Sequence, residues 1–396
     1  MLSDPVVIVS AARTPMGGLQ GAFSAMAAPA LGAAAIEAAL ARASLPPEMV
    51  EEVLMGCVLP AGLGQAPARQ AALAAGLPLS AAATTVNKMC GSGMQAVMLA
   101  HDMIAAGSAG VVIAGGMESM SNAPYLLDKA RAGYRLGHGR LIDHMFFDGL
   151  EDAYEKGRLM GSFAEECAEH YQFTRQAQDE FALASLSRAQ HAIANGDFAG
   201  EITPVRVPAG KTDILVSIDE QPGKAMPEKI PTLKPAFKPG GTVTAANSSS
   251  ISDGAAALLL MRASLAEQRG LTPLAKIIGH ATHAQAPAQF ATAPIGAMRK
   301  LAAKTGWALK DVDLFEINEA FAVVTMAAMR ELDLPHEKVN IHGGACALGH
   351  PIGASGARVL VTLLAALQKQ GGKRGVASLC IGGGEATAMA VERFDS

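Results

Sequence analysis

Cysteine is scarce in this chain of 396 residues, and its five cysteines are far apart. They stand at positions 57, 90, 167, 346 and 380, so no Cys-x-x-Cys pair is available for a zinc site. A disulfide framework is excluded as well, because such frameworks need several cysteines within a short chain. We therefore expect a reducing compartment and predict a cytoplasmic protein.

Charge is also sparse, with 17% charged residues and a net charge of −4. A protein that binds nucleic acid broadly would carry an excess of basic residues, so nucleic acid is disfavoured as a partner. A local basic mouth for a phosphorylated ligand is still compatible with this balance. Hydrophobic residues make up 50% of the chain, which is enough to form the cores of two or three domains.

Long uninterrupted hydrophobic segments are missing too. Residues 14–36 carry no charge, but Pro15, Pro29 and four glycines interrupt them, so we expect a loop and then an Ala-rich helix rather than a membrane span. At the N-terminus no basic region precedes the apolar residues 6–9, which have the length of a strand. We expect neither export nor association with a membrane.

What the chain does contain is a weak but long internal repeat. In each copy an Ala-Pro pair opens a helix, a short strand follows, and a Val-Asn pair leads into a glycine-rich turn, a second helix and a strand that ends near Gly-Gly. The first copy covers residues 28–118 and the second covers residues 293–385. Short apolar strands that alternate with longer helices predict α/β layering with mixed or parallel sheets. Two copies indicate two similar domains packed face to face.

Residues of about 119–250 break this pattern. They include a predicted helical stretch at residues 165–191 and a loop stretch rich in Gly, Pro and Lys at residues 208–241. We interpret them as a long excursion that could cap a site.

Cys90 begins the first of four motifs that carry chemistry, the run Cys90-Gly91-Ser92-Gly93 directly before a predicted helix. A thiolate at a helix N-terminus is stabilised by the helix dipole and by backbone N–H groups, so Cys90 is a candidate nucleophile. The alternative is a small buried residue in front of a tightly packed helix.

Three further motifs offer groups that could assist a nucleophile. His350 lies on a glycine-rich turn whose direction Pro351 fixes, and is a candidate base; the alternative is a packed turn in which it satisfies a local carbonyl. Cys380 ends a strand before glycines 382–384, whose N–H groups could stabilise an oxyanion. A side chain larger than hydrogen at these glycines would crowd the cavity. The alternative is that Cys380 is a core residue at a strand end. Asn318 could orient a water or an oxyanion, or could simply cap a helix.

Together these motifs resemble those of the thiolase family, in the family's order. They are Asn87-Lys88-Met89-Cys90-Gly91-Ser92-Gly93, Asn318-Glu319-Ala320-Phe321, Gly349-His350-Pro351 and Cys380-Ile381-Gly382-Gly383-Gly384. Similar stretches at residues 11–15, 115–120 and 241–245 extend the resemblance over essentially the whole chain. It implies the thiolase fold, an α/β protein whose two similar αβα halves form a five-layered αβαβα sandwich with an inserted loop domain.

The resemblance also implies limits for these parts. The N-terminal half would cover residues 1–118 and be completed by about 251–272. The loop domain over the coenzyme A site would cover 119–250, and the C-terminal half would cover 273–396.

The activity implied by the resemblance is ping-pong acyl transfer. Cys90 would be the acylated nucleophile, His350 would take its proton, and Cys380 would move the proton on the α-carbon or on the departing coenzyme A thiol. Asn318 would hold a water that forms one oxyanion hole with His350, and the backbone N–H groups of Cys90 and Gly382 would form the other. The chemistry agrees, because forming a carbon–carbon bond beside a thioester needs an acyl carrier and a separate base.

The expected substrates and products are acyl-CoA and coenzyme A, with no other cofactor and no metal. By the resemblance, Ser249 lies near the pantetheine, and the apolar residues around it are Leu150, Met160, Phe237, Ala320 and Phe321. Leu159 stands where short-chain biosynthetic thiolases commonly have histidine, which argues against restriction to acetoacetyl-CoA. Phe290 lies near the closed end of the acyl pocket and could limit chain length. An acetyl-CoA acetyltransferase and a broad-chain 3-ketoacyl-CoA thiolase of fatty-acid β-oxidation therefore both stay open.

Two further kinds of thiolase-like protein fit the sequence less well. A non-catalytic protein of this family that binds coenzyme A or lipid would be expected to lose one of the two cysteines or the histidine, and a decarboxylating relative would show two histidines and one cysteine. His280 and His283 have a spacing that suggests a metal, but no carboxylate or cysteine neighbours them in the sequence. The resemblance also implies a homo-oligomer, either a dimer paired through the first-half sheet or a tetramer joined by residues 120–145.

Overall fold

The computed structural model describes residues 4–394, and its largest element is one ten-stranded mixed sheet. The strand order is β12-β13-β14-β11-β1-β10-β5-β3-β4, with the short β2 paired to β10. The strands of the N-terminal half are β1 (Val6–Arg13), β2 (Gly17–Gly18), β3 (Glu52–Gly56), β4 (Ala82–Val86), β5 (Val111–Ser119) and β10 (Ser252–Arg262). Those of the C-terminal half are β11 (Ala275–Ala284), β12 (Leu314–Ile317), β13 (Arg374–Ile381) and β14 (Glu385–Glu392).

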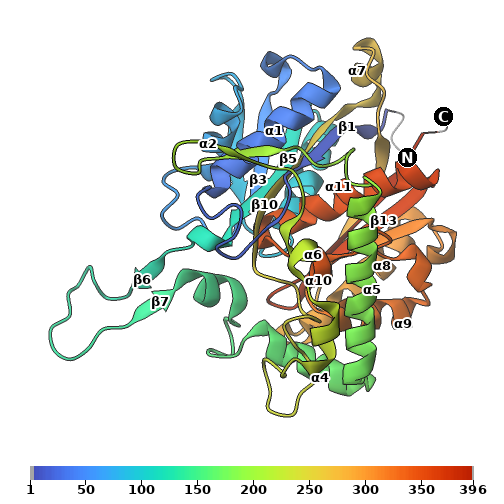
Figure 1. Ribbon diagram of the computed structural model, residues 1–396. Coiled ribbons are helices and arrows are strands. Elements are labelled where there is room, and N and C mark those ends of the chain that lie inside the picture. The colour runs from blue at the N-terminus through green and yellow to red at the C-terminus, as the bar shows by residue number, and fades with distance from the viewer. Residues whose placement is uncertain (1–3, 395–396) are drawn as a thin grey trace.

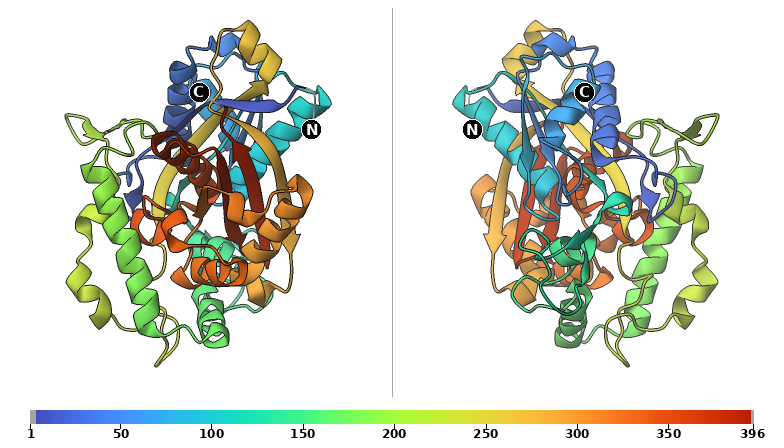
Figure 2. Two further views of the ribbon diagram at one scale, coloured as in Figure 1. Left: turned by 90° about the vertical axis from the view of Figure 1, so that its right-hand side faces the viewer. Right: turned by 90° about the vertical axis from the view of Figure 1, so that its left-hand side faces the viewer.

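Helices cover the sheet on its outer faces, and one pair of helices lies between its two halves (Figure 1). The outer helices are α1 (Ala28–Ala43) and α2 (Pro67–Ala74) on the N-terminal half, and α8 (Ala293–Thr305) and α9 (Ala322–Leu332) on the C-terminal half. The central pair, α3 (Ser92–Ala106) and α11 (Ile352–Gln370), pack on each other and on strands of both halves. The layers confirm the predicted five-layered αβαβα sandwich; Figure 2 shows its N-terminal half above the C-terminal half from two sides.

The strands are apolar on both faces because both faces are covered. In β1, Val6 and Ile8 belong to the core around the central helices, whereas Val7 and Val9 belong to the core under α1. Side chains alternate between the faces of a strand, so a strand between two helical layers needs apolar residues at every position. This accounts for the short apolar runs in the sequence.

The internal repeat is confirmed by the strand pairing. In the first half β3 and β5 are parallel, β5 and β10 antiparallel, and β10 and β1 antiparallel. In the second half β12 and β13 are parallel, β13 and β14 antiparallel, and β14 and β11 antiparallel. A short antiparallel contact between β1 and β11 joins the halves into one sheet. The counterpart of β4 is reduced to the single bridge between Phe315 and Val339.

Between β5 and β10 the chain leaves the sandwich, as predicted. It forms a hairpin of β6 (Tyr125–Leu127) and β7 (Leu141–Asp143) that projects from the body in Figure 1, and a smaller hairpin of β8 (Val205–Val207) and β9 (Ile214–Val216). The helices here are α4 (Met160–Tyr171), α5 (Arg175–Ala194) and α6 (Glu220–Lys224). The predicted helical stretch at residues 165–191 is therefore two helices with a break between them. The residue limits of the two halves and the loop domain stay a prediction.

The remaining helices are α7 (Ala263–Gln268) and α10 (Ala345–Leu348), and short turns of helix complete the described chain. Residues 14–27 are loop apart from β2, and the Ala-rich α1 follows, in agreement with the sequence. Within residues 4–394, none of the helices combines the length and the hydropathy needed to cross a bilayer.

Candidate active site

The two central helices bring Cys90 and His350 to the same region of the middle layer. Each residue lies two positions before the first residue of its helix, α3 for Cys90 and α11 for His350. The helices cross so closely that an added Cβ at Gly93 or Gly356 would lie 2.7 or 2.4 Å from the backbone of the other helix. Glycine at the crossing therefore brings the two helix starts together.

Both residues open onto a largely apolar cavity of about 370 Å³. Every site residue predicted from the sequence lines it except Asn318, namely Cys90, His350, Cys380, Gly382, Ser249, Leu150, Met160, Phe237, Phe290, Ala320 and Phe321. The wall also contains Leu159 and several residues that the sequence did not indicate, among them Phe146, Ser248, Ile251 and Ile352. Phe146 and Leu150 come from a π-helical turn, Phe146–Leu150, so the excursion supplies one side of the cavity.

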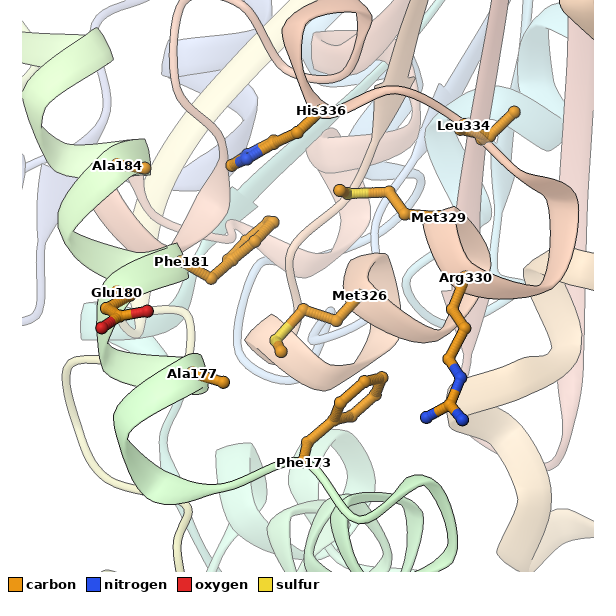
Figure 3. A pocket seen from close by; sticks show the side chains of 10 residues that line it. All are labelled: Phe173, Ala177, Glu180, Phe181, Ala184, Met326, Met329, Arg330, Leu334 and His336. Carbon is orange, nitrogen blue, oxygen red and sulfur yellow. The ribbon is translucent and has the colours of Figure 1, made fainter.

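A second, more open hollow lies between α5 and α9 and is lined by Phe173, Phe181, Met326 and His336, among others (Figure 3). None of the predicted site residues lies in it.

Cys90 follows a tight turn that its neighbours hold in place. Met89 has a φ of 47°, which is rare for a residue with a side chain. The Ser92 hydroxyl donates to the Met89 carbonyl at 2.6 Å and accepts from the Lys88 N–H at 2.9 Å, which fixes the turn. Strain of this kind persists only where the surrounding structure enforces it, and it is concentrated at functional sites.

The surroundings of the Cys90 sulfur act on its pKa in opposite directions. Burial raises its pKa to about 11, although the backbone N–H groups of Gly382 and of Cys90 itself act in the opposite direction. Loss of hydration therefore outweighs the stabilisation that a helix start gives to a thiolate. The same two N–H groups do lie close to the sulfur, where an oxyanion formed on a Cys90 adduct would be.

His350 is held by α11 in an orientation that leaves one nitrogen free. Its Nδ1 lies 2.5 Å from Oγ of Ser355, and the Ser355 hydroxyl donates to the Pro351 carbonyl at 2.9 Å. The hydroxyl oxygen therefore accepts from Nδ1–H, and this tautomer leaves the lone pair on Nε2, which has no hydrogen-bond partner among the described residues. Burial, assisted by the positive charge of Arg358, lowers the pKa of His350 to about 3. The imidazole is neutral and able to accept a proton.

Cys380 is the third reactive group in the cavity. Burial, with a further contribution from the nearby Cys90, raises its pKa well above the ordinary value for a thiol. The prediction that any side chain would crowd the glycines after it is wrong for Gly382, where an added Cβ meets nothing nearer than Met160 at 3.9 Å. Gly384 is the crowded one, because its φ is 85° and an added Cβ would lie 2.5 Å from the Gln285 carbonyl.

Asn318 adjoins the site from behind His350. It is not a helix cap, since α9 is preceded by Phe321 and no side chain caps that helix. Its Nδ2 lies 3.4 Å from Nδ1 of His350, and its backbone N–H donates to the Ser378 carbonyl at 3.0 Å. Its Oδ1 is buried and without a hydrogen-bond partner among residues 4–394.

Glu118 is a residue of this region for which the sequence indicated no role. Its buried carboxylate accepts from the N–H groups of Val58 at 2.9 Å, Leu59 at 3.1 Å and Gly353 at 2.8 Å. Gly353 is in the first turn of α11, so this carboxylate ties the segment after β3 to the helix that follows His350. Burial raises the pKa of Glu118 to about 7. A lone acidic residue near the end of an otherwise uncharged strand was the available signal.

Two family descriptions match consecutive parts of the chain. "Thiolase, N-terminal domain" matches residues 6–264 and "Thiolase, C-terminal domain" matches residues 271–393. The chain belongs to the thiolase family.

Curated thiolase relatives align with nearly the full chain. "Acetyl-CoA acetyltransferase 2" of Arabidopsis thaliana is 53% identical, with 98% of this chain and 96% of the relative covered. "Acetyl-CoA acetyltransferase" of Cupriavidus necator is 49% identical, with 98% and 99% covered.

Solved thiolase structures have the same fold. The acetyl-CoA acetyltransferase of Bacillus anthracis superposes with a TM-score of 0.96 at 41% identity, with 99% of each chain covered. The Acat5 thiolase of Ascaris suum, in complex with coenzyme A, superposes with a TM-score of 0.93 at 39% identity, with 98% and 100% covered.

Leu159 and Phe290, which gave opposite indications of the acyl chain length, both line the cavity of this thiolase. Phe290 is buried, and its ring packs edge to face on Phe321 with centroids 6.2 Å apart. Leu159 precedes the first residue of α4. Phe290 is therefore fixed by an aromatic neighbour, whereas Leu159 lies where the excursion enters a helix.

Proposed function

We propose that this thiolase is an acetyl-CoA acetyltransferase that condenses two molecules of acetyl-CoA to acetoacetyl-CoA and runs the reverse thiolysis with coenzyme A. The observation that carries the proposal is the gathering of Cys90, His350 and Cys380 in one apolar cavity. The names of the relatives, which are about 50% identical over the full chain, support the same substrate.

In the first half-reaction Sγ of Cys90 attacks the thioester carbonyl of acetyl-CoA while His350 Nε2 takes the thiol proton. The bond between the carbonyl carbon and the coenzyme A sulfur then breaks, and Cys380 gives its proton to the departing thiolate. The products are acetyl-Cys90, free coenzyme A, a Cys380 thiolate and a protonated His350.

In the second half-reaction the Cys380 thiolate removes a proton from the α-carbon of a second acetyl-CoA. The resulting carbanion attacks acetyl-Cys90, a carbon–carbon bond forms, and the bond to Sγ breaks. Cys90 recovers its proton from His350, and acetoacetyl-CoA leaves. Each cysteine thus ends as the thiol it was at the start.

Two oxyanions form in this sequence, and the site offers donors for both. The N–H groups of Cys90 and Gly382 lie beside Sγ of Cys90, where the tetrahedral intermediate carries its negative oxygen. For the enolate of the second acetyl-CoA, we propose His350 together with a water held by Asn318, whose unpartnered Oδ1 is a suitable acceptor for that water.

The remaining cavity residues are proposed to hold the pantetheine arm. Leu150, Met160, Phe237, Ala320 and Phe321 give an apolar wall, and Ser249 is the polar residue predicted beside the arm. No cofactor other than coenzyme A as substrate or product is needed for these steps.

Trapping the acetyl group tests the division of roles between the cysteines. With labelled acetyl-CoA, the Cys380→Ala enzyme should retain label on the protein and fail to form acetoacetyl-CoA. The Cys90→Ala enzyme should retain none. Absence of label on both variants, or equal labelling of both, would refute the assignment.

A ladder of 3-ketoacyl-CoA substrates tests the chain length, with Cys90→Ala as the blank. A sharp loss of thiolysis beyond four carbons is expected, because the ring of Phe290 lines the cavity and packs on Phe321, where it would limit the room for a longer acyl chain. Equal or rising rates with longer chains would favour the alternative, a broad-chain 3-ketoacyl-CoA thiolase.

We also propose that the protein is a cytoplasmic homo-oligomer. β4 ends the ten-stranded sheet, and it is uncharged and partly exposed, which is typical of an edge that pairs with another chain. The hairpin of β6 and β7 exposes Tyr125, Leu136 and Leu141, which favours association through this hairpin and hence a tetramer. Light scattering on the full chain and on a variant with a shortened hairpin should give a tetramer and a dimer, respectively. All five cysteines are free thiols, as suits a reducing compartment.

A further inference from the structure

Three side chains of types that can bind a metal meet where α3 lies beside β11, outside the substrate cavity. His101 and Asp102 are on α3, and His280 is on β11, 178 residues from Asp102. Oδ1 of Asp102 lies 2.9 Å from Nδ1 of His101 and 3.0 Å from Nε2 of His280. No carboxylate neighbours His280 in the sequence, which argued against a metal. The fold brings the carboxylate of Asp102 next to it.

Burial and access are suited to an exchangeable ion. The side chains of His101 and His280 are only 16% and 11% exposed, whereas that of Asp102 is 58% exposed. The two imidazoles are therefore held by packing, with their rings edge to face at 5.1 Å between centroids. The carboxylate side of the cluster is open to water, which can complete the coordination of an ion.

We propose that His101, Asp102 and His280 bind a divalent transition-metal ion such as Zn²⁺ or Co²⁺. Two imidazole nitrogens and one carboxylate oxygen are a donor set that suits these ions, whereas Mg²⁺ and Ca²⁺ prefer oxygen ligands throughout. His283, the other member of the pair seen in the sequence, takes no part, since its Nε2 lies 3.0 Å from Gln285 Oε1.

The spacing of the donor atoms fits one ion after a small shift. Bonds of about 2.0 to 2.2 Å place the ligand atoms of one zinc about 3 to 3.5 Å apart. The three donor atoms here all lie within 4.8 Å of one another. One ion therefore requires rotation of the exposed Asp102 side chain out from between the two imidazoles and a small adjustment of the imidazole rings.

One nearby charge opposes the ion. The ammonium group of Lys304 donates to the backbone carbonyl of His280 at 3.1 Å and so lies near the cluster. A single carboxylate against this lysine predicts moderate rather than very tight binding. Because α3 lies in the chain between β4 and β5 of the N-terminal half and β11 belongs to the C-terminal half, a bound ion would connect the two halves.

Co²⁺ is the probe for the test, since its visible d–d bands report the ligands. The chelator-treated full-length protein should bind one Co²⁺ per chain, with d–d bands but without the charge-transfer band that a cysteine ligand would give. Asp102→Asn and His280→Gln should each weaken binding at least tenfold. Zn²⁺ should displace Co²⁺ and, at about 100 times its dissociation constant, raise the Tm by roughly 3 °C.

His191→Gln is the matched control, because His191 is exposed on α5 and pairs only with Asn195 in the described structure. It should bind Co²⁺ as the unaltered protein does. The Tm of each variant without metal shows whether it folds; should His280→Gln fail to fold, the exposed Asp102→Asn variant still decides. Absence of d–d bands, a thiolate charge-transfer band, or unchanged binding by Asp102→Asn would each overturn the proposal.

Discussion

Replacement of Glu118 by glutamine should remove a pH dependence of stability that a single buried carboxyl causes. Burial raises the pKa of this group from 4.5 to about 7 in the folded protein. A group whose pKa is raised on folding stabilises the protein below its unfolded pKa and loses that contribution as the pH rises through its folded pKa. The difference of 2.5 pKa units corresponds to about 3 kcal/mol, lost between about pH 4.5 and pH 7.5.

Glutamine keeps the shape of the side chain but has no charge to bury. In Glu118→Gln one oxygen is replaced by an NH₂ group, so at least one of the N–H groups of Leu59, Val58 and Gly353 loses its acceptor, and leaving a buried donor unpaired costs about 1 to 3 kcal/mol. The variant should be less stable than the unaltered enzyme at pH 4.5. By pH 7.5 the gap should shrink by about 3 kcal/mol, because only the unaltered enzyme loses stability from this group.

Urea unfolding at one protein concentration gives the free energy of unfolding of both proteins at pH 4.5 and pH 7.5. The change of their difference between the two pH values isolates the effect of Glu118, because the contributions of other titrating groups cancel. Glu48→Gln changes the same atoms at an exposed position and is the control. Parallel stability profiles for Glu118→Gln and the unaltered enzyme would refute the reasoning. Since Gly353 is in the first turn of the helix after His350, kcat should also fall, by about tenfold.

Three further predictions concern the site and its packing. Ser355→Ala removes the acceptor for His350 Nδ1–H, so steady-state kinetics should show kcat reduced by about tenfold with little change in KM; an unchanged kcat would contradict the tautomer. Gly384→Ala should lower the Tm by several degrees in calorimetry, whereas Gly382→Ala should stay within about 1 kcal/mol, because only the former meets backbone; the reverse order would be evidence against the glycine geometry. Gly116→Ala should fail to fold or lose more than about 3 kcal/mol in urea unfolding, since its Cβ would lie 2.1 Å from a carbonyl of α11; full stability would contradict the close approach.

The sequence could predict the layers because local patterns determine them. Short apolar runs of strand length predict strands with helices packed on both faces. The internal repeat predicts two such sets of strands and helices. The reactive residues Cys90, His350 and Cys380 could also be predicted, through motifs that fall at strand ends and helix starts, whereas Phe146 and Ile352 of the same cavity could not. What the sequence could not show is that the second copy reduces the counterpart of β4 to the bridge between Phe315 and Val339.

Contacts between distant segments were the part that the sequence could not provide. Glu118 and Gly353 are 235 residues apart, and nothing in either local pattern indicates that they meet. The same is true of Asp102 beside His280. The raised pKa of Cys90 could not be predicted for a related reason: the helix start is local and visible, whereas the burial depends on distant segments that include Ile352.

That burial bears on how the proposed acyl transfer begins. With a pKa of about 11 for Cys90 and about 3 for His350, the resting pair is a neutral thiol and a neutral imidazole. Moving the proton from one to the other before substrate binds is unfavourable, because burial raises the pKa of the thiol and lowers that of the imidazole. A preformed ion pair is therefore a minor state. Proton transfer to His350 becomes favourable only as the Cys90–carbonyl bond forms and the negative charge passes from sulfur to an oxygen within reach of the Cys90 and Gly382 N–H groups. The base and the oxyanion donors must act in the same step, which gives a reason for the fold to bring the loop after β13 onto the start of α3.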